Sequence, residues 1–141
     1  MSLDALQPGL KHRQSIRVND RLTVPAVSEA FTGFADMPPV FATAFLVGFA
    51  EWTCIEALRP YLKPGQRTVG VHVDLSHCAA TPVGMTVTAE VELVAVEGRK
   101  LRFRVVCRDE IELISEGYHD RHVIDAGRFM ARLAGKRGPA D

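Results

Sequence analysis

The most apolar stretch of the chain covers residues 40–55, and its apolar side chains fall on nearly every side of a helix rather than on one face. A helix of this kind is buried over most of its surface. The pattern predicts a helix from Thr43 to Leu58, which Arg59 and Pro60 end. Glu51 is the charged residue of the stretch. Because an unpaired carboxylate is costly to bury, we expect Glu51 to have either a bonding partner or a catalytic role. It is therefore the first candidate for chemistry.

Alternation of apolar and polar residues marks five strands, since successive side chains of a strand point to opposite faces of a sheet. The predicted strands cover residues 11–18, 68–76, 86–96, 101–107 and 111–124. A turn at residues 97–99 joins the third and fourth of them into a hairpin. The remaining segments are a loose arm at 1–10, a short helix or lid at 22–34, a short closing helix at 125–133 and a polar tail at 134–141.

The order of these elements is one strand, one long helix and then four consecutive antiparallel strands. A helix that is apolar all round needs cover, which a single curved sheet wrapped around it supplies. We therefore predict an α+β protein with the hotdog fold, in which a curved antiparallel sheet of about five strands surrounds one long central helix. Residues 1–141 form a single domain, with 1–10 and 134–141 flexible. The exposed sheet edge invites a second subunit, so we expect a homodimer.

Charge and cysteine content argue against several classes of partner. Lys plus Arg and Asp plus Glu each number 17, and this balance disfavours nucleic acid or an anionic membrane bound by bulk charge. Glu51 interrupts the best candidate for a membrane span, and the first residues carry no signal-peptide pattern. The three cysteines, an odd number without metal-ligand spacing, fit buried free thiols and a reducing cytoplasm.

His77 is the second candidate for chemistry, because it continues the apolar face of its strand in register with Val71, Val73 and Leu75. It should therefore point toward the helix. A buried Glu51 carboxylate and this imidazole could form an acid–base pair, and histidine suits proton transfer near neutral pH. The alternative is a structural hydrogen bond between two buried polar groups.

The spacing of the other histidines suggests no chemistry. His72 has the opposite parity to His77 and should face solvent or the other subunit. His119 and His122 are predicted to be ordinary strand residues. Because alternation sends neighbouring side chains of a strand to opposite faces, we predict no metal site at residues 119–122.

Thr43 is the third polar group near the helix, and its position favours a helix cap. In a regular helix the eight residues from Thr43 to Glu51 span about 12 Å along the axis. A direct contact between these two side chains would require Thr43 to lie in a segment that folds back before the helix begins. The spacing leaves both arrangements open.

Five strings of residues, at 39–43, 51–54, 76–88, 96–101 and 117–121, keep an unbroken spacing relative to one another. Together they closely resemble the fluoroacetyl-CoA thioesterase family of hotdog enzymes, from about residue 38 to residue 129. The resemblance implies a dimeric enzyme that hydrolyses an acyl-CoA thioester. It concerns most of the chain and rests on the residue strings, not on composition.

By position, the resemblance places the family's catalytic threonine, glutamate and histidine on Thr43, Glu51 and His77. It also places the glycine that lines the thioester site on Gly70 and an arginine associated with the site on Arg121. For the last two residues alternatives stay open, since Gly70 could be a packing glycine and Arg121 a surface residue of a strand.

One departure from the family pattern concerns the lid. In the fluoroacetyl-specific enzyme two phenylalanines near the lid form a hydrophobic gate. Phe34 matches the first of them, and Met37 stands at the position of the second. Because methionine is flexible and adapts its shape, we expect a less strict gate here and a weaker selectivity for a fluorinated acyl group.

The reaction implied is hydrolysis of a short-chain acyl-CoA. The thioester carbonyl would lie near Thr43 and the amide of Gly70, where donors stabilise the developing oxyanion. Glu51 would act as nucleophile, through a mixed anhydride, or as general base for water, while His77 transfers protons and Arg121 binds CoA phosphates or braces the site. No metal or bound cofactor is needed, because CoA arrives as part of the substrate. Two alternatives stay open: a hotdog acyl-CoA hydratase or dehydratase, and a non-catalytic acyl-CoA binding protein.

Overall fold

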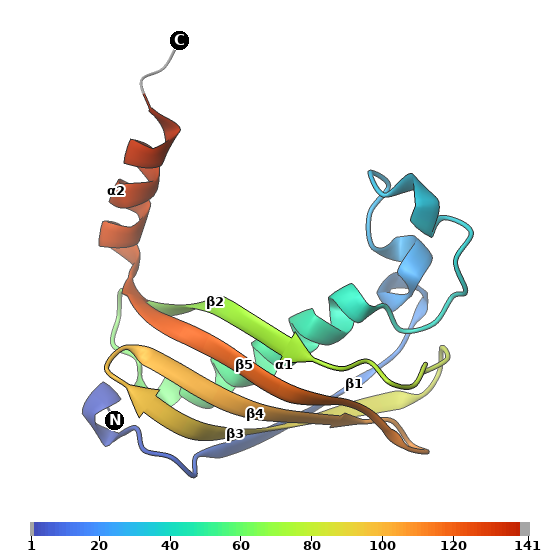
Figure 1. The fold of residues 1–141 in the computed structure, drawn as a ribbon, viewed down its shortest axis with the longest axis horizontal. Coiled ribbons are helices and arrows are strands. Elements are labelled where there is room, and N and C mark those ends of the chain that lie inside the picture. Colours follow the sequence, from blue (N-terminus) through green and yellow to red (C-terminus); the bar gives the residue numbers. More distant parts are fainter. Residues whose placement is uncertain (1, 139–141) are drawn as a thin grey trace.

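The computed structural model describes residues 2–138, which form one antiparallel sheet with a long helix against one of its faces (Figure 1). The sheet has five strands in the order β1-β3-β4-β5-β2, so that β1 and β2 are its edges. The five predicted strands are confirmed, each to within two residues at either end. They are β1 (Lys11–Arg17), β2 (Gln66–Leu75), β3 (Thr86–Glu97), β4 (Lys100–Arg108) and β5 (Leu113–Asp125).

The predicted long helix is confirmed as α1 (Thr43–Leu58), which continues into one short 3-10 turn, η5 (Arg59–Tyr61). One side of α1 packs on the sheet, with Leu46, Ala50 and Cys54 completely shielded from solvent. These side chains follow one another at intervals of four, which places them on one face of a helix. They join the inward-facing apolar residues of the strands in a single core, among them Val87, Leu93, Phe103, Val105 and Ile114.

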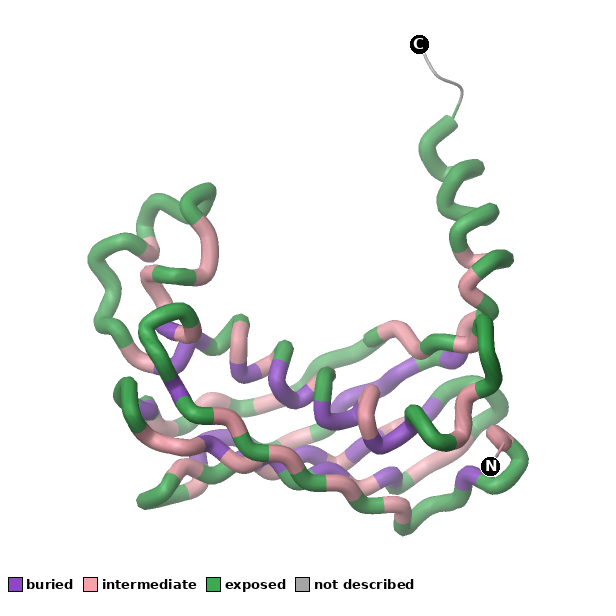
Figure 2. Tube along the Cα trace, turned by 180° about the vertical axis from the view of Figure 1, so that it is seen from behind, coloured by how far each residue is buried: buried purple, intermediate pink, exposed green. Residues whose placement is uncertain are grey.

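The other side of α1 is exposed in the single chain, which corrects our expectation of a helix covered all round (Figure 2). Ala44, Gly48 and Trp52 are exposed, and Trp52 keeps 45% of its accessible surface. The edge strand β2 is also uncovered, since Val71 and Val73 are 53% and 44% exposed. We expected these two valines to pack on the helix, but the residue of β2 that lies against α1 is Gly70, and a register shift between residues 70 and 72 interrupts the alternation. An apolar pattern on every side of a helix does not reveal which side the sheet will cover.

The segment before α1, where we expected a short helix or lid, is a loop with three short 3-10 helices. These are η2 (Asp20–Leu22), η3 (Val24–Ala26) and η4 (Thr32–Phe34). The loop closes on itself at its base, because Thr23 and Phe41 form a β-bridge and the amide of Ala42 donates to the carbonyl of Leu22 at 3.0 Å. Figure 1 shows this lid loop, residues 23–41, beyond the sheet at the N-terminal end of α1. The two ends of the lid loop therefore meet beside the first turn of α1.

Both ends of the chain differ from our expectation. The predicted loose arm contains the 3-10 turn η1 (Leu3–Ala5), Leu6 is buried, and the amide of Gly9 donates to the carbonyl of Leu93 at 2.8 Å. The last helix, α2 (Ala126–Arg137), is longer than predicted, so residues 134–137 are helical, and 139–141 lie outside the described residues. No residue of α2 is buried, and it projects from the end of β5 (Figure 1). Among residues 2–138 no helix is long and apolar enough to cross a membrane.

Candidate active site

Thr43 and His77 form a direct contact at the beginning of α1. Thr43 Oγ1 lies 2.7 Å from His77 Nδ1, a short hydrogen bond between two side chains that are 34 residues apart in the sequence. Thr43 is the first residue of α1, whereas the cap position is Ala42, which makes no side-chain capping bond. The helix-cap interpretation of Thr43 is therefore wrong. Its hydroxyl is hydrogen-bonded to the imidazole of His77 instead.

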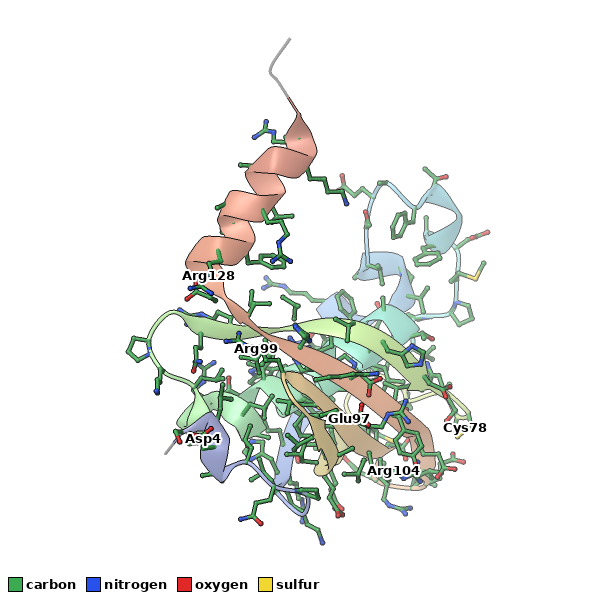
Figure 3. All side chains as sticks on the ribbon, turned by 60° about the vertical axis from the view of Figure 1, so that its left-hand side comes forward. Asp4, Cys78, Glu97, Arg99, Arg104 and Arg128 are labelled. Atoms are coloured by element: carbon green, nitrogen blue, oxygen red, sulfur yellow. The ribbon has the colours of Figure 1, made fainter. Side chains whose placement is uncertain are left out.

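Backbone contacts between the lid loop and the loop after β2 bring Thr43 and His77 together. The amide of Phe41 donates to the carbonyl of Thr81 at 2.9 Å, and Val40 forms a β-bridge with Pro82. The hydroxyl of Thr81 in turn donates to the carboxylate of Asp109 at 2.8 Å, which ties the same loop to the turn between β4 and β5. Figure 3 labels Cys78, the residue after His77, beyond the end of β2. The pair is thus held by two segments that are both fixed at their bases.

His77 sits in surroundings that favour a neutral imidazole. Burial lowers the pKa of His77 below its ordinary value, because desolvation disfavours the charged ring. Its Nε2 atom is shielded from solvent and has no hydrogen-bond partner among residues 2–138. Buried ring nitrogens are usually paired, so this atom needs an explanation from the function of the site. A neutral ring near pH 7 can both give and take a proton.

Glu51 lies two turns further along α1 and pairs with Arg121, not with His77. Its Oε2 atom accepts a hydrogen bond from Arg121 Nη1 at 3.2 Å. The expectation of a fully buried carboxylate is wrong, since 38% of the Glu51 side chain is exposed. The expected contact between Glu51 and His77 is not formed in the described chain either. The reason is position along the helix: His77 reaches Thr43, and Glu51 is about 12 Å further along the axis.

Arg121 is the centre of the second cluster. Only 3% of it is exposed, so the interpretation as a surface strand residue is wrong. Its Nε donates to the hydroxyl of Thr68 at 2.9 Å, and its Nη2 donates to the carbonyl of Thr68, also at 2.9 Å. With Nη1 on Glu51, the guanidinium is held at both ends. This geometry fits an arginine that braces the site, and its burial in the single chain disfavours a role in binding the phosphates of CoA.

Gly70 lies against both charged residues of the second cluster. It pairs with Arg121 across β2 and β5, next to a shift in register between residues 70 and 72. A Cβ atom at this position would lie 3.1 Å from His119 Cε1 and 3.4 Å from Glu51 Oε2. A methyl group here would require these neighbours to shift by a few tenths of an ångström, so the close approach of Glu51 and His119 favours glycine. The packing role of Gly70 is therefore supported, and its role in lining a thioester site stays a prediction.

His119 belongs to the same cluster, and our sequence analysis missed it. It is 1% exposed, and its Nδ1 contacts the carbonyl of His72 at 2.8 Å. Its Nε2 lies 3.0 Å from Arg121 Nη1. The alternation of side chains along β5 could have revealed His119. Residues 119 and 121 share one face of the strand, which here is the face toward α1. We considered the spacing of His119 only as a metal motif and so overlooked it.

The two predicted gate residues lie in the lid loop. Phe34 is half-buried and packs edge-to-face on Phe31, with ring centroids 5.5 Å apart. Met37 is 46% exposed. Since both ends of the lid loop lie beside Thr43, the positions of Phe34 and Met37 are compatible with a gate, which stays a prediction.

A family model, a curated protein and a solved structure that resemble this chain all belong to the same family. The model of the family described as fluoroacetyl-CoA-specific thioesterase, FlK, matches residues 18–127. The fluoroacetyl-CoA thioesterase of Streptantibioticus cattleyicolor is 40% identical over 133 residues, which are 94% of this chain and 96% of that protein. A solved structure of a phenylalanine-to-alanine variant of FlK, in complex with fluoroacetate and CoA, is 40% identical and has a TM-score of 0.86, over 88% of this chain and 99% of that one.

A more distant structure shows the fold alone. A hot-dog-like protein from Thermanaerovibrio acidaminovorans is 22% identical, with a TM-score of 0.80 over 94% of each chain. The predicted hotdog fold is thereby confirmed. The match of the family model and the 40% identity over nearly the whole length make this chain a member of the fluoroacetyl-CoA-specific thioesterase family, within the hotdog-fold thioesterases.

Proposed function

We propose that this chain is a thioesterase that hydrolyses a short-chain acyl-CoA, such as fluoroacetyl-CoA, to the acid and free CoA. The observation that carries the proposal is the pairing of Thr43 with His77 and of Glu51 with Arg121 along α1. A thioesterase needs a donor for the oxyanion, a base or nucleophile, and a group that protonates the leaving thiolate. These residues supply all three functions without a metal ion.

Thr43 and Gly70 supply the oxyanion donors in this proposal. When the proton of His77 is on Nδ1, it donates to Thr43 Oγ1, and the hydroxyl hydrogen of Thr43 is free for the thioester oxygen. The amide of Gly70, beside Glu51, supplies a second donor. In the same tautomer Nε2 of His77 carries a lone pair. In the nucleophilic route Nε2 takes a proton from the water that opens the mixed anhydride and passes it to the CoA thiolate, which was released in the preceding step and is still bound. In the general-base route Glu51 takes the first proton of the attacking water, and Nε2 takes the second and passes it to the thiolate.

Glu51 is the group that opens the thioester bond, directly or through water. Arg121 binds its Oε2 atom, and Oε1 has no hydrogen-bond partner among residues 2–138. As nucleophile, Oε1 attacks the acyl carbon, the C–S bond breaks, and water then hydrolyses the mixed anhydride. As general base, Oε1 takes a proton from a water molecule that attacks the same carbon. Rapid quenching followed by mass spectrometry distinguishes these routes, because an acyl group on Glu51 appears only in the first.

The acyl group enters beneath the lid loop, where Phe34 and Met37 form the gate. Because the methionine side chain adapts its shape, the gate admits acyl groups of several sizes. We therefore expect acetyl-CoA and other short acyl-CoAs to be substrates beside fluoroacetyl-CoA.

A homodimer completes the site in this proposal. The β2 edge exposes Val71 and Val73, and the uncovered side of α1 exposes Trp52, so that both offer apolar surface to a second copy. The separation of about 12 Å along α1 favours a site that uses Thr43 and His77 of one subunit and Glu51 of the partner subunit. Complementation tests this arrangement. If the site is shared, mixing the inactive Glu51→Gln and His77→Ala proteins restores one intact site per mixed dimer, whereas a site within one subunit stays inactive.

A reducing compartment is the proposed location. Cys54, Cys78 and Cys107 are all free thiols, but Cys78 is exposed, so the expectation of a buried thiol is wrong for that residue. Free thiols persist in the cytoplasm, where disulfides are rare. We therefore propose a cytoplasmic enzyme.

Release of free thiol from acyl-CoA tests the proposed activity. The assay uses acetyl-CoA, fluoroacetyl-CoA and longer saturated acyl-CoAs as substrates, with Glu51→Gln as the control that keeps the shape of the side chain and removes its charge. We expect turnover by the wild type and a loss of about 100-fold or more in the variant. Saturable binding without release of thiol would favour the non-catalytic binder. Hydration of an enoyl-CoA in the absence of thiol release would favour a hydratase.

A further inference from the structure

We propose that His119 is a positioning residue of the thioesterase site, which holds Arg121 on Glu51 as a neutral imidazole, so that its protonation contributes one step to the loss of activity in acid. This inference rests on the proposed function, because Glu51 must be the reacting carboxylate for its position to affect turnover. His119 itself does not touch the substrate in the proposed scheme. It acts through the guanidinium of Arg121.

The hydrogen bonds of His119 define its tautomer. The carbonyl of His72 can only accept, so the Nδ1 atom at 2.8 Å from it must carry a hydrogen and donate. In a neutral ring Nε2 is then an acceptor. Arg121 Nη1, which can only donate, lies 3.0 Å from it. Both contacts are satisfied by one protonation state, the neutral Nδ1–H form.

A single nitrogen atom links His119 to the carboxylate. Arg121 Nη1 has two hydrogens, of which one is directed to His119 Nε2 and the other to Glu51 Oε2. The far side of the guanidinium is fixed on Thr68 through Nε and Nη2. The plane of Arg121 is thus held between β2 and His119. Removal of the Nε2 acceptor frees the end of the guanidinium that contacts Glu51.

Protonation of His119 would reverse this contact. The charged ring would direct an N–H toward Nη1, so that two donors and two positive charges would face each other at 3.0 Å. The charged groups around His119 are Arg121 and Asp120 on β5 and Glu51 on α1, while β2 presents the carbonyl of His72. On β4, its paired neighbour Phe103 carries no charge.

Taken together, burial and the charged groups around His119 favour its neutral form. Burial, together with the charge of Arg121, lowers the pKa of His119, although the His72 carbonyl, Glu51 and Asp120 act in the opposite direction. His119 is therefore neutral at pH 7 and gains a proton only in acid. Because the folded pKa lies below that of the unfolded chain, the stability that this site contributes is present at neutral pH and is lost as the pH falls.

Two substitutions at position 119 separate positioning from simple packing. In His119→Gln the amide oxygen reaches about as far as Nε2 and can accept from Arg121, but the side chain does not titrate. In His119→Asn the shorter amide can donate to the carbonyl of His72, as Nδ1 does, but offers no acceptor to Arg121. His122→Gln is the matched control, because His122 is exposed and lies three positions further along the same strand.

The expected kinetics differ between the two variants. His119→Gln should keep kcat within about threefold of the wild type at pH 7 and lose one step of the expected decrease of kcat in acid, while the step that belongs to His77 remains. His119→Asn should lower kcat at every pH by about tenfold or more, because the reacting carboxylate is displaced. His122→Gln should leave both the rate and the pH profile unchanged. Circular dichroism and Tm confirm that each variant is folded.

Nitrogen-15 NMR of the imidazoles tests the same point without turnover. We expect the signals that His119→Gln removes to belong to a neutral Nδ1–H ring at pH 7. A charged ring at pH 7 would overturn the proposal, and so would a wild-type rate in a folded His119→Asn. If His119→Asn does not fold, an unchanged acid decrease in His119→Gln overturns it instead. Absence of thiol release by the wild type itself is a different result, which rejects the proposed thioesterase function.

Discussion

Replacement of Gly70 by alanine tests how tightly the second cluster is held. The new Cβ atom would lie 3.1 Å from His119 Cε1, whereas carbon atoms in optimal contact are about 3.5–4.0 Å apart. The His119 ring would therefore have to move by about half an ångström. It cannot move alone, because its two nitrogens are bound to the carbonyl of His72 and to Arg121. The displacement should pass to the contact between Arg121 and Glu51.

The expected magnitude follows from that last contact. The distance from Arg121 Nη1 to Glu51 Oε2 is already 3.2 Å, at the long end of the range for hydrogen bonds, so a small shift breaks it. Overpacking of this kind costs about 1–3 kcal/mol, and the lower entropy of the unfolded alanine chain offsets about 0.4–1 kcal/mol. We expect Tm to fall by roughly 2–6 °C. We expect kcat to fall by about tenfold or more, because the carboxylate is misplaced.

The assay is thiol release from acetyl-CoA at saturating substrate, with Tm measured on the same preparation. The matched control is Gly135→Ala, because no atom lies within 4 Å of the position of its Cβ and the residue is exposed on α2. That substitution should keep the activity and stabilise the helix by about 0.5–1 kcal/mol. A Gly70→Ala protein with the rate and Tm of the wild type would refute the reasoning, since His119 and Arg121 would then be free to adapt.

Four further predictions follow from single contacts. Thr43→Val keeps the shape of the side chain but removes the hydroxyl, so thiol release should slow by about 100-fold, while Thr43→Ser should retain most activity; equal rates for the two variants would exclude an oxyanion role. Arg121→Lys keeps the charge but cannot reach Thr68, His119 and Glu51 together, so kcat and Tm should both fall, and a protein as stable as the wild type would contradict the bracing role. Because burial lowers the pKa of His77, the stability that its neutral ring contributes should be lost as the pH falls, and Tm of the wild type should decrease in acid more than that of His77→Gln. In a thiol titration only the exposed Cys78 should react rapidly in the native protein, because burial raises the pKa of Cys54 and Cys107 to about 12, and all three thiols should react after denaturation.

The elements of the fold were predictable because their periodicities are long and regular. Residues 86–93 alternate strictly and residues 101–107 alternate except at Val106, and β3 and β4 match these segments closely. The apolar stretch around Glu51 likewise predicted α1 with its observed bounds. The lid loop has no such period, since its 3-10 turns depend on local backbone contacts such as the bridge between Thr23 and Phe41. Its conformation could not be predicted from the pattern.

The sequence indicated residues that the structure places in two side-chain clusters, but it did not indicate their contacts. Parity correctly directed His77 toward α1, yet parity gives a face and not a position along the helix axis. For this reason we expected His77 to contact Glu51, whereas it contacts Thr43 in the structure. His119 was missed because its proposed role depends on its contact with Arg121. The alternation of β5 implies this contact only when both residues are assigned to the buried face of the strand.

In the proposed dimer, the exposed side of α1 would let the two clusters take part in one reaction although they lie apart along the helix. Between Thr43 and Glu51 this side carries the small residues Ala44 and Gly48, and no atom lies within 4 Å of the position of a Cβ at Gly48. Small residues let another surface approach the helix backbone closely, so a second copy or a pantetheine chain can lie along α1 between the clusters. The apolar character of this side first suggested a helix buried within one chain. In the proposed dimer it is explained by a second subunit that covers this side. In that view Glu51 is only half-buried in one subunit because the rest of its cover belongs to the partner subunit and the substrate.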